Sequence, residues 1–132
     1  MKHKLFLLHI AVLLLGWTWL VYTQNPLFIA APPAVVGNGS GHTLLVDVNR
    51  DGKLDLVTQH LLQRVVTVQL GDGTGKFAMA PGSPISLNYS PGEAKVGDIN
   101  GDGLVDLGVS RSEQDSVDIF FGDGTGKFKS KS

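Results

Sequence analysis

The chain has 132 residues and a formal net charge of −1, which fits one small domain and excludes a strongly basic nucleic-acid-binding surface. It contains no cysteine, so a disulfide framework and a thiolate metal site are both excluded. Its 17 glycines, and the lack of helical patterns after Asn25, favour an all-β fold.

The first predicted element is an apolar segment at the N-terminus. Lys2, His3 and Lys4 precede a nearly unbroken apolar run from Leu5 to Tyr22. A basic start before an apolar run is typical of a secretory signal peptide, and the run is also about long enough to span a membrane. We therefore expect residues 1–24 to form a hydrophobic helix that acts as a signal peptide or as an uncleaved signal anchor. Either role exports the remaining chain, so we expect a secreted or extracytoplasmic protein, attached to a membrane only through this segment.

A linker and a repeat follow. Residues 25–41 are rich in proline and glycine, and we expect an extended linker there. Residues 47–77 align without a gap to residues 98–128, an offset of 98 − 47 = 51 positions, and 15 of the 31 aligned positions are identical. The duplication predicts two structural units, residues 42–92 and residues 93–132, the second of them incomplete.

Each unit divides into short strands. In the first unit we predict strands at residues 42–48, 54–59, 65–70 and 77–80, with residues 85–87 extending or following the fourth. Apolar and polar residues alternate along the third strand, which fits a half-buried antiparallel strand.

Four short antiparallel strands in a unit of about 50 residues are typical of a propeller blade. The predicted fold is therefore two four-stranded antiparallel propeller-type blades, a partial β-propeller, preceded by the N-terminal helix. Two blades leave apolar faces open, which predicts self-association or binding to a protein partner. We expect His42 and His60 at the surface.

An acidic loop separates the first two strands of each unit. Ca²⁺ prefers six to eight oxygen ligands, and side-chain oxygens at positions 1, 3 and 5 of a tight loop wrap around one point. Glycine at position 6 allows the sharp turn, position 7 offers a backbone carbonyl, and position 9 offers a carboxylate in place of the glutamate that an EF-hand has at position 12. We predict two calcium sites, with the ligands Asp47, Asn49, Asp51, Lys53 and Asp55 in one and Asp98, Asn100, Asp102, Leu104 and Asp106 in the other.

Two further expectations concern these loops. The alternative to a metal site is a glycine-rich turn in which Asp and Asn side chains bond the backbone. Arg50 stands at position 4 of the first loop, where its positive charge is expected to weaken that calcium site, whereas the second loop has Gly101 there.

The second repeated motif is rich in glycine. Gly71–Phe77 recurs as Gly122–Phe128, but neither copy has the spacing of a phosphate-binding loop. We predict hairpin turns between the third and fourth strands, with Asp-Gly pairs at the turn and the aromatic residue filling the space between blades.

The two Asp-x-Asn-x-Asp-Gly-x-x-Asp-Leu loops, which end at Leu56 and Leu107, and the two Gly-Asp-Gly-Thr-Gly-Lys-Phe turns resemble the FG-GAP/VCBS repeat family. This is the blade type of integrin α-subunit β-propellers and of many secreted bacterial proteins. The resemblance covers roughly residues 42–129. It implies calcium-binding propeller blades, of which roughly seven close a ring in the family, while two are present here.

No nucleophile–base pair, nucleophile elbow or metalloprotease motif occurs, so we do not expect an enzyme. We expect an exported, calcium-binding repeat module used for adhesion or protein–protein contact, without a nucleic-acid partner. One alternative is a carbohydrate-binding or accessory part of a secreted enzyme system, for which Tyr89 is the candidate exposed aromatic residue. The other is a remnant of a longer propeller protein.

Overall fold

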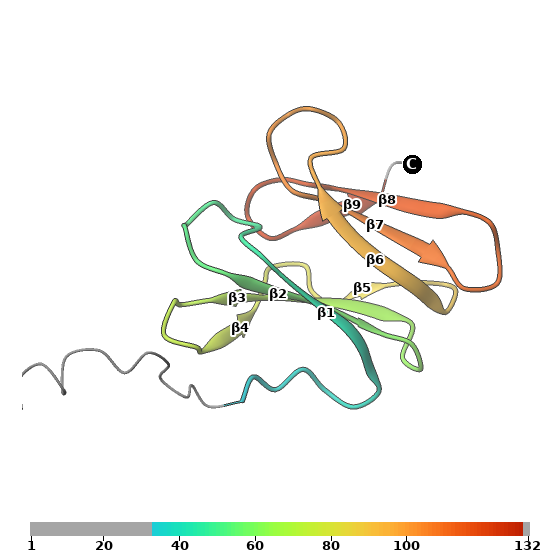
Figure 1. Cartoon of the computed structure of the whole chain (residues 1–132), viewed down its shortest axis with the longest axis horizontal. Coiled ribbons are helices and arrows are strands. Elements are labelled where there is room, and N and C mark those ends of the chain that lie inside the picture. The colour runs from blue at the N-terminus through green and yellow to red at the C-terminus, as the bar shows by residue number, and fades with distance from the viewer. Residues whose placement is uncertain (1–32, 131–132) are drawn as a thin grey trace, which may run out of the picture. The chain divides into compact units, whose positions relative to one another are not determined.

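The computed structural model describes residues 33–130, so the predicted helix at residues 1–24 lies outside the described residues. The described part is all β, with two antiparallel sheets (Figure 1). No helix within it is long and apolar enough to cross a membrane. Both sheets belong to one compact unit of the chain, Pro32–Ser132.

The first sheet has five strands rather than the predicted four. Its strands are β1 (Ser40–Val46), β2 (Asp55–His60), β3 (Val65–Gly71), β4 (Phe77–Met79) and β5 (Ile85–Ser86). The order is β1-β2-β3-β4, and β5 also pairs with β3. Strand β4 pairs only with the last residues of β3. The first residues of β3, Val65 and Val66, can therefore pair with β5. Residues 85–86 therefore form a separate strand, which the sequence left open.

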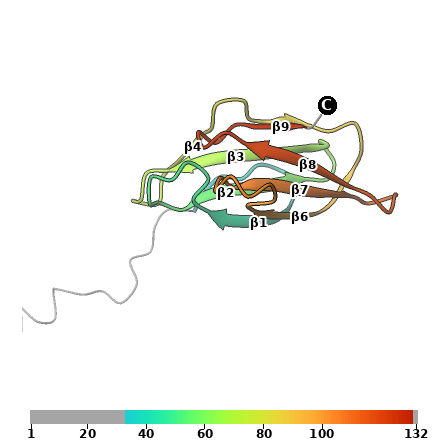
Figure 2. The same ribbon diagram turned by 90° about the horizontal axis from the view of Figure 1, so that it is seen from above.

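The second sheet repeats the first in order and register. Its four strands are β6 (Pro91–Gly97), β7 (Asp106–Arg111), β8 (Val117–Gly122) and β9 (Phe128–Ser130), and they run as a meander (Figure 2). Leu56 pairs with Gln69 in the first sheet, and Leu107 pairs with Phe120 in the second. The register also shifts at equivalent places, after Ser40 and after Pro91. The duplication seen in the sequence is therefore a duplication of backbone structure.

One face of each sheet contributes to a shared hydrophobic core. The buried residues of this core are Val48, Val57, Val66, Val68 and Ala80 from the first sheet and its connections, and Ala94, Leu107, Val109 and Phe120 from the second. Burying a valine, leucine or phenylalanine side chain contributes about 1.5–3 kcal/mol. The core therefore holds both acidic loops on a common scaffold.

The expectation that His60 lies at the surface was wrong. The side chain is only 5% exposed, and its Nε2 lies 3.0 Å from Oγ1 of Thr67. The reason is that β2 is an interior strand, paired on both edges and covered on both faces. His42, on the edge strand β1, is exposed as expected.

Candidate metal centre

Both acidic loops are strand–loop–strand hairpins, as the sequence predicts. The first joins β1 to β2 and the second joins β6 to β7. Each turns through glycines with positive φ, 78° at Gly52 and 80° at Gly103, a conformation that glycine adopts at little cost.

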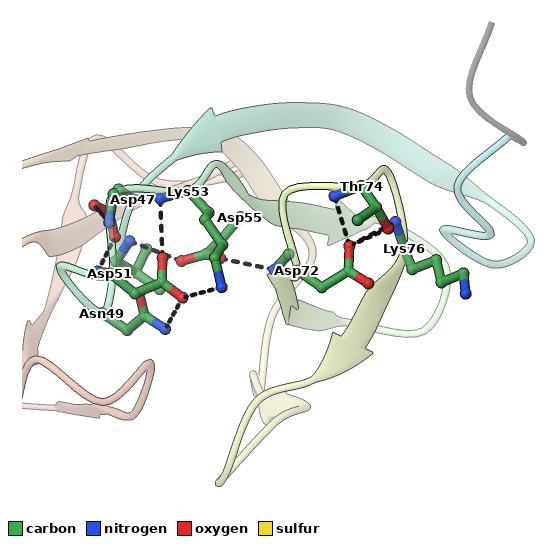
Figure 3. A network of polar contacts seen from close by, with 11 residues as sticks. Asp47, Asn49, Asp51, Lys53, Asp55, Asp72, Thr74 and Lys76 are labelled. Carbon is green, nitrogen blue, oxygen red and sulfur yellow. Dashed lines mark hydrogen bonds and ion pairs between the residues drawn. The ribbon is translucent and has the colours of Figure 1, made fainter. Parts of the chain in front are cut away.

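In the first loop, the acidic side chains accept hydrogen bonds from the loop's own backbone (Figure 3). Asp47 accepts from the N–H groups of Asp51 and Gly52, at 3.2 and 2.8 Å. Asn49 Oδ1 accepts from the N–H of Asp51 at 3.1 Å, and Asp51 Oδ1 accepts from the N–H of Lys53 at 2.9 Å. The carboxylates at positions 1 and 5 are thus fixed on the inside of the turn by backbone donors, which offset their mutual repulsion.

The second loop has most of the same bonds, with one difference: Asp98 Oδ1 accepts from the N–H of Gly101 at position 4, at 2.7 Å, whereas Asp47 Oδ1 accepts from the N–H of Asp51 at position 5. Asp98 accepts from the N–H of Gly103 at 2.8 Å, and Asn100 Oδ1 accepts from the N–H of Asp102 at 2.9 Å. Asp102 Oδ1 accepts from the N–H of Leu104 at 2.7 Å. In both loops the asparagine amide also donates to the position-5 carboxylate, at 3.3 Å in the first and 2.9 Å in the second. The two loops therefore share most of their hydrogen bonds.

The carboxylate at position 9 has a structural role that the sequence did not reveal. Asp55 is fully buried; its Oδ2 accepts from the N–H of Val48 at 2.9 Å, and its Oδ1 accepts from the N–H of Gly71 at 2.8 Å. Figure 3 shows Asp55 between the acidic loop and the glycine turn that holds Asp72. One side chain thus ties the two repeated motifs together.

Asp106 does the same in the second sheet. It is fully buried and accepts from the N–H groups of Ile99 and Asn100 through Oδ2, at 2.9 and 3.3 Å, and of Gly122 through Oδ1 at 3.0 Å. The sequence signal for this link is the equal spacing, 71 − 55 = 16 and 122 − 106 = 16 residues. Two motifs at a fixed separation in both repeats indicate a contact between them.

The position-5 carboxyls are held in the charged form. The backbone N–H of Lys53 lowers the pKa of Asp51, and the backbone N–H of Leu104 lowers the pKa of Asp102. The charge of Arg50 further lowers the pKa of Asp102. Charged oxygens held in a turn suit a hard cation.

Arg50 contacts the other loop, and its expected effect on a calcium site stays a prediction. Its guanidinium reaches the second loop, where Nη2 donates to the carbonyl oxygen of Gly103. The backbone of Arg50 has positive φ, 61°. The charge of Arg50 lowers the pKa of Asp102 in the second loop, a contact between the loops that the sequence did not predict.

The donors suit calcium, but their present arrangement satisfies backbone groups. All the predicted side-chain ligands carry oxygen, the donor that Ca²⁺ prefers. Within residues 33–130, no group of three or more His, Cys, Asp or Glu side chains converges so as to hold a metal ion. The ligand role of position 9, and both calcium sites, therefore stay predictions.

The glycine motifs form the predicted turns. Asp72 N–H donates to the carbonyl of Lys76 at 3.0 Å, and Asp72 Oδ1 accepts from the N–H and the hydroxyl of Thr74, both at 2.7 Å. Asp123 makes the equivalent bonds in the second sheet. Phe128 packs against the shared core, as expected, whereas its equivalent Phe77 is not among the residues that pack against this core.

A further polar cluster involves Tyr89, Arg111 and Asp118. Arg111 Nη2 lies 2.9 Å from Asp118 Oδ1, and its guanidinium lies 4.6 Å from the centre of the Tyr89 ring. Burial opposes ionisation of Asp118, but the hydrogen bonds from Arg111, the hydroxyl of Tyr89 and the charge of Arg111 together outweigh it and lower the pKa of that carboxyl. Tyr89 is half-buried against the core, so it does not offer the exposed ring that the carbohydrate-binding alternative requires.

Comparison with known proteins agrees with the motifs. Residues 47–109 match the model of a family described as the FG-GAP-like repeat. The match begins at the first residue of one acidic loop and includes the whole of the other. No curated protein and no solved structure matches the chain.

Proposed function

We propose, on the premise that residues 47–109 form an FG-GAP-like repeat, that this chain is a non-catalytic, β-propeller-type module for protein–protein contact. In this proposal each acidic loop binds one Ca²⁺, and the two sheets act as propeller blades. The apolar N-terminal run supports export, and an exported chain meets enough calcium to fill such loops and take part in adhesion.

The observation that carries the calcium proposal is the close similarity of the two loop networks, which share the bonds to the side chains at positions 3 and 5 and the bond from position 6 to position 1. Each loop presents carboxylates at positions 1 and 5, an amide oxygen at position 3 and a backbone carbonyl at position 7. A plain turn needs only some of these groups, yet all of them recur 51 residues later with most of the same hydrogen bonds.

Our ligand assignment uses this network. Asp47, Asn49, Asp51 and Lys53 would hold the cation in the first loop, with Asp55 sharing its oxygens between the cation and backbone N–H groups. The equivalent five residues would serve the second loop. The bound ion would supply positive charge that offsets carboxylate repulsion. The chain's own residues set the loop shape and fix the loop to the sheet.

Calorimetric titration of the full chain with Ca²⁺ tests the proposal. We expect two ions per chain, and a stabilisation of about 2.7 kcal/mol for each site at a hundredfold excess over its dissociation constant. The variant Asp51→Asn should bind one ion, and Asp51→Asn combined with Asp102→Asn should bind none. Both side chains are exposed, so the sheets should remain folded.

The matched control is Asp72→Asn. Asp72 is also an exposed turn aspartate with a lowered pKa, but it lies in the glycine turn. It should leave both sites intact. Absence of calcium uptake by the unchanged chain, or equal loss with Asp72→Asn, would refute the assignment.

A further inference from the structure

The contact between the two sheets joins unlike faces. The inner face of the first sheet consists of Leu44, Val57, Val66, Val68 and Leu70. It packs against the inner face of the second sheet, which consists of Ala94, Val96, Leu107, Val109 and Phe120. Shifting the first set by 51 residues gives Lys95, Gly108, Val117, Ile119 and Phe121, which form the outer face of the second sheet. The two sheets thus stack front to back.

The same shift relates the remaining two faces. The inner face of the second sheet corresponds to Thr43, Leu45, Leu56, Thr58 and Gln69, which form the outer face of the first sheet. The outer face of the second sheet and the outer face of the first therefore have the same relationship as the two faces already in contact. Within one chain the two inner faces form one interface. The two outer faces could form a second, equivalent interface, but only between different chains.

Exposure of equivalent side chains supports this relationship. Val66 is 0% exposed in the shared core, but its equivalent Val117 is 57% exposed. Val96 is partly buried against the core, but its equivalent Leu45 is 60% exposed. Val117 and Leu45 are thus exposed apolar side chains at positions where the repeat elsewhere buries them, whereas Leu56 and Thr58 on the same outer face as Leu45 are already buried, 6% and 0% exposed.

A strand edge is left open in the same way. In the first sheet, β5 pairs with β3 through Val66 and Ile85, and the N–H of Leu87 donates to the carbonyl of Arg64 at 2.8 Å. In the second sheet, β9 pairs only with the end of β8, and no strand of residues 33–130 pairs with the edge at Val117. The residues equivalent to β5 are Ala34 and Val35, which precede β1.

The segment before β1 lies against the outer face of its own first sheet. Val35 and Val36 border a groove of about 380 Å³ on the outer face of the first sheet, together with His60, Thr67 and Gln69. Val35 is 83% exposed, and Oε1 of Gln69 is buried without a hydrogen-bond partner among the described residues. The amide nitrogen of Gln69 also donates to the carbonyl of Val35 at 3.3 Å, so this segment already lies against part of the face that the second copy would contact.

We propose that a second copy of this chain occupies that groove. The outer face of the second sheet of one copy packs on the outer face of the first sheet of the next, and Ala34 pairs with Val117 of the neighbour as Ile85 pairs with Val66. The proposal identifies the partner in the proposed function as another copy, and it does not depend on calcium. Because such a contact is heterologous, repeated association produces rings or open chains rather than two-fold dimers.

Cysteine cross-linking tests this register, since the chain has no cysteine of its own. Directly paired residues on antiparallel strands lie about 4.5–5.5 Å apart at Cα, within disulfide range. Full-length Ala34→Cys and Val117→Cys variants are mixed and oxidised. We expect a disulfide-linked dimer that contains one chain of each variant. The variant carrying both substitutions should give a ladder of dimers, trimers and longer species.

Two control variants calibrate the result. Val65→Cys with Ser86→Cys should close within one chain, since these residues pair in the structure. Glu113→Cys, exposed in the turn between β7 and β8, should not cross-link to Ala34→Cys. Cross-linking of Val117→Cys to itself, or a mixture that stays monomeric while the Val65–Ser86 control closes, would overturn the proposal.

Sedimentation velocity gives a second readout that needs no disulfide. The unchanged chain should sediment as an oligomer, and Val117→Lys should shift it to a smaller species. An unchanged distribution would overturn the proposal. Calcium titration of the same samples keeps the outcomes separate, because failure of assembly leaves the metal sites intact and failure of calcium binding leaves the cross-link intact.

Discussion

The two sheets share backbone geometry but differ in the side chains on their faces. Strand order, register, bulges and the buried aspartates are the same in both. On the faces, the residue of the second sheet equivalent to Thr58 is Val109, and the residue equivalent to Val57 is Gly108. Duplication has preserved the polar links that shape each loop, while the packing surfaces have adapted to different neighbours.

The two acidic loops show the same contrast at smaller scale. Most of their internal bonds match, but position 4 is Arg50 in one loop and Gly101 in the other, and only the N–H of Gly101 donates to the position-1 carboxylate. Both residues have positive φ, which suits glycine and strains arginine. Arg50 instead links the loops across the two sheets through the Gly103 carbonyl. The loops are therefore alike in shape and unequal in charge.

The largest loss of stability should come from changing the buried aspartates, Asp55 and Asp106, which link the two repeated motifs in the same way in both sheets. Asp55→Asn and Asp106→Asn each replace a carboxylate that accepts backbone bonds by an amide that has only one acceptor. Hydrogen bonds to charged groups contribute about 1.5–3 kcal/mol each, so we expect each change to lower the free energy of unfolding by about 2–4 kcal/mol. Urea unfolding measures this. A loss below that of exposed Asp72→Asn would contradict the structural role.

The next largest loss of stability is expected from alanine at Gly71 and Gly122, the glycines where each glycine turn approaches its acidic loop. A Cβ at Gly71 would lie 2.2 Å from the carbonyl oxygen of Leu54, and a Cβ at Gly122 would lie 2.1 Å from that of Val105. Forcing backbone apart costs about 1–3 kcal/mol, so both alanine variants should unfold at lower urea by similar amounts. Gly97→Ala is the control, because no atom lies within 4 Å of its added Cβ. Equal stability of all three variants would exclude the close approach.

Arg50 variants sharpen the comparison of the loops. Arg50→Gly relieves the positive-φ strain that Arg50→Ala retains, so the glycine variant should be more stable by about 1 kcal/mol. Both variants remove the guanidinium from the second loop. If calcium binds as proposed, the affinity of that loop should rise by roughly threefold to tenfold, since a surface charge near 4 Å is worth about 1 kcal/mol in water. Site-resolved NMR titration would contradict this if the first loop responded instead.

The smallest effect concerns pH. Backbone or side-chain hydrogen bonds lower the pKa of Asp51, Asp72, Asp102 and Asp123 below the model-compound value of 3.8. A lowered folded-state pKa contributes stability above 3.8 that is lost as the pH falls through the folded value. We therefore expect the calcium-free chain to keep its stability from neutral pH to about pH 4 and to weaken below it. Circular dichroism across this range measures the midpoint. Loss of structure above pH 5 would show that other groups dominate.

Much of the fold follows from local sequence rules, and the rest depends on tertiary contacts. Alternating valines predicted β3, and the repeated Asp-Gly pairs predicted both glycine turns. The sequence did not predict that Asp55 also accepts a hydrogen bond from the backbone N–H of Gly71. The spacing of the acidic loop identifies Asp55 as a ligand, but it does not show a contact 16 residues away. His60 was predicted at the surface, but its burial depends on the strands and segments that cover β2, which the local sequence does not show. It assigned Arg50 to its own loop because a long side chain can reach a segment 53 residues away.

Native mass spectrometry of the full chain in calcium tests the central claim most directly, because it counts ions on each chain. We predict two calcium ions on the unchanged protein, one on Asp51→Asn and two on Asp72→Asn. A spectrum without calcium on the folded, unchanged chain would contradict the claim that these duplicated loops are metal sites.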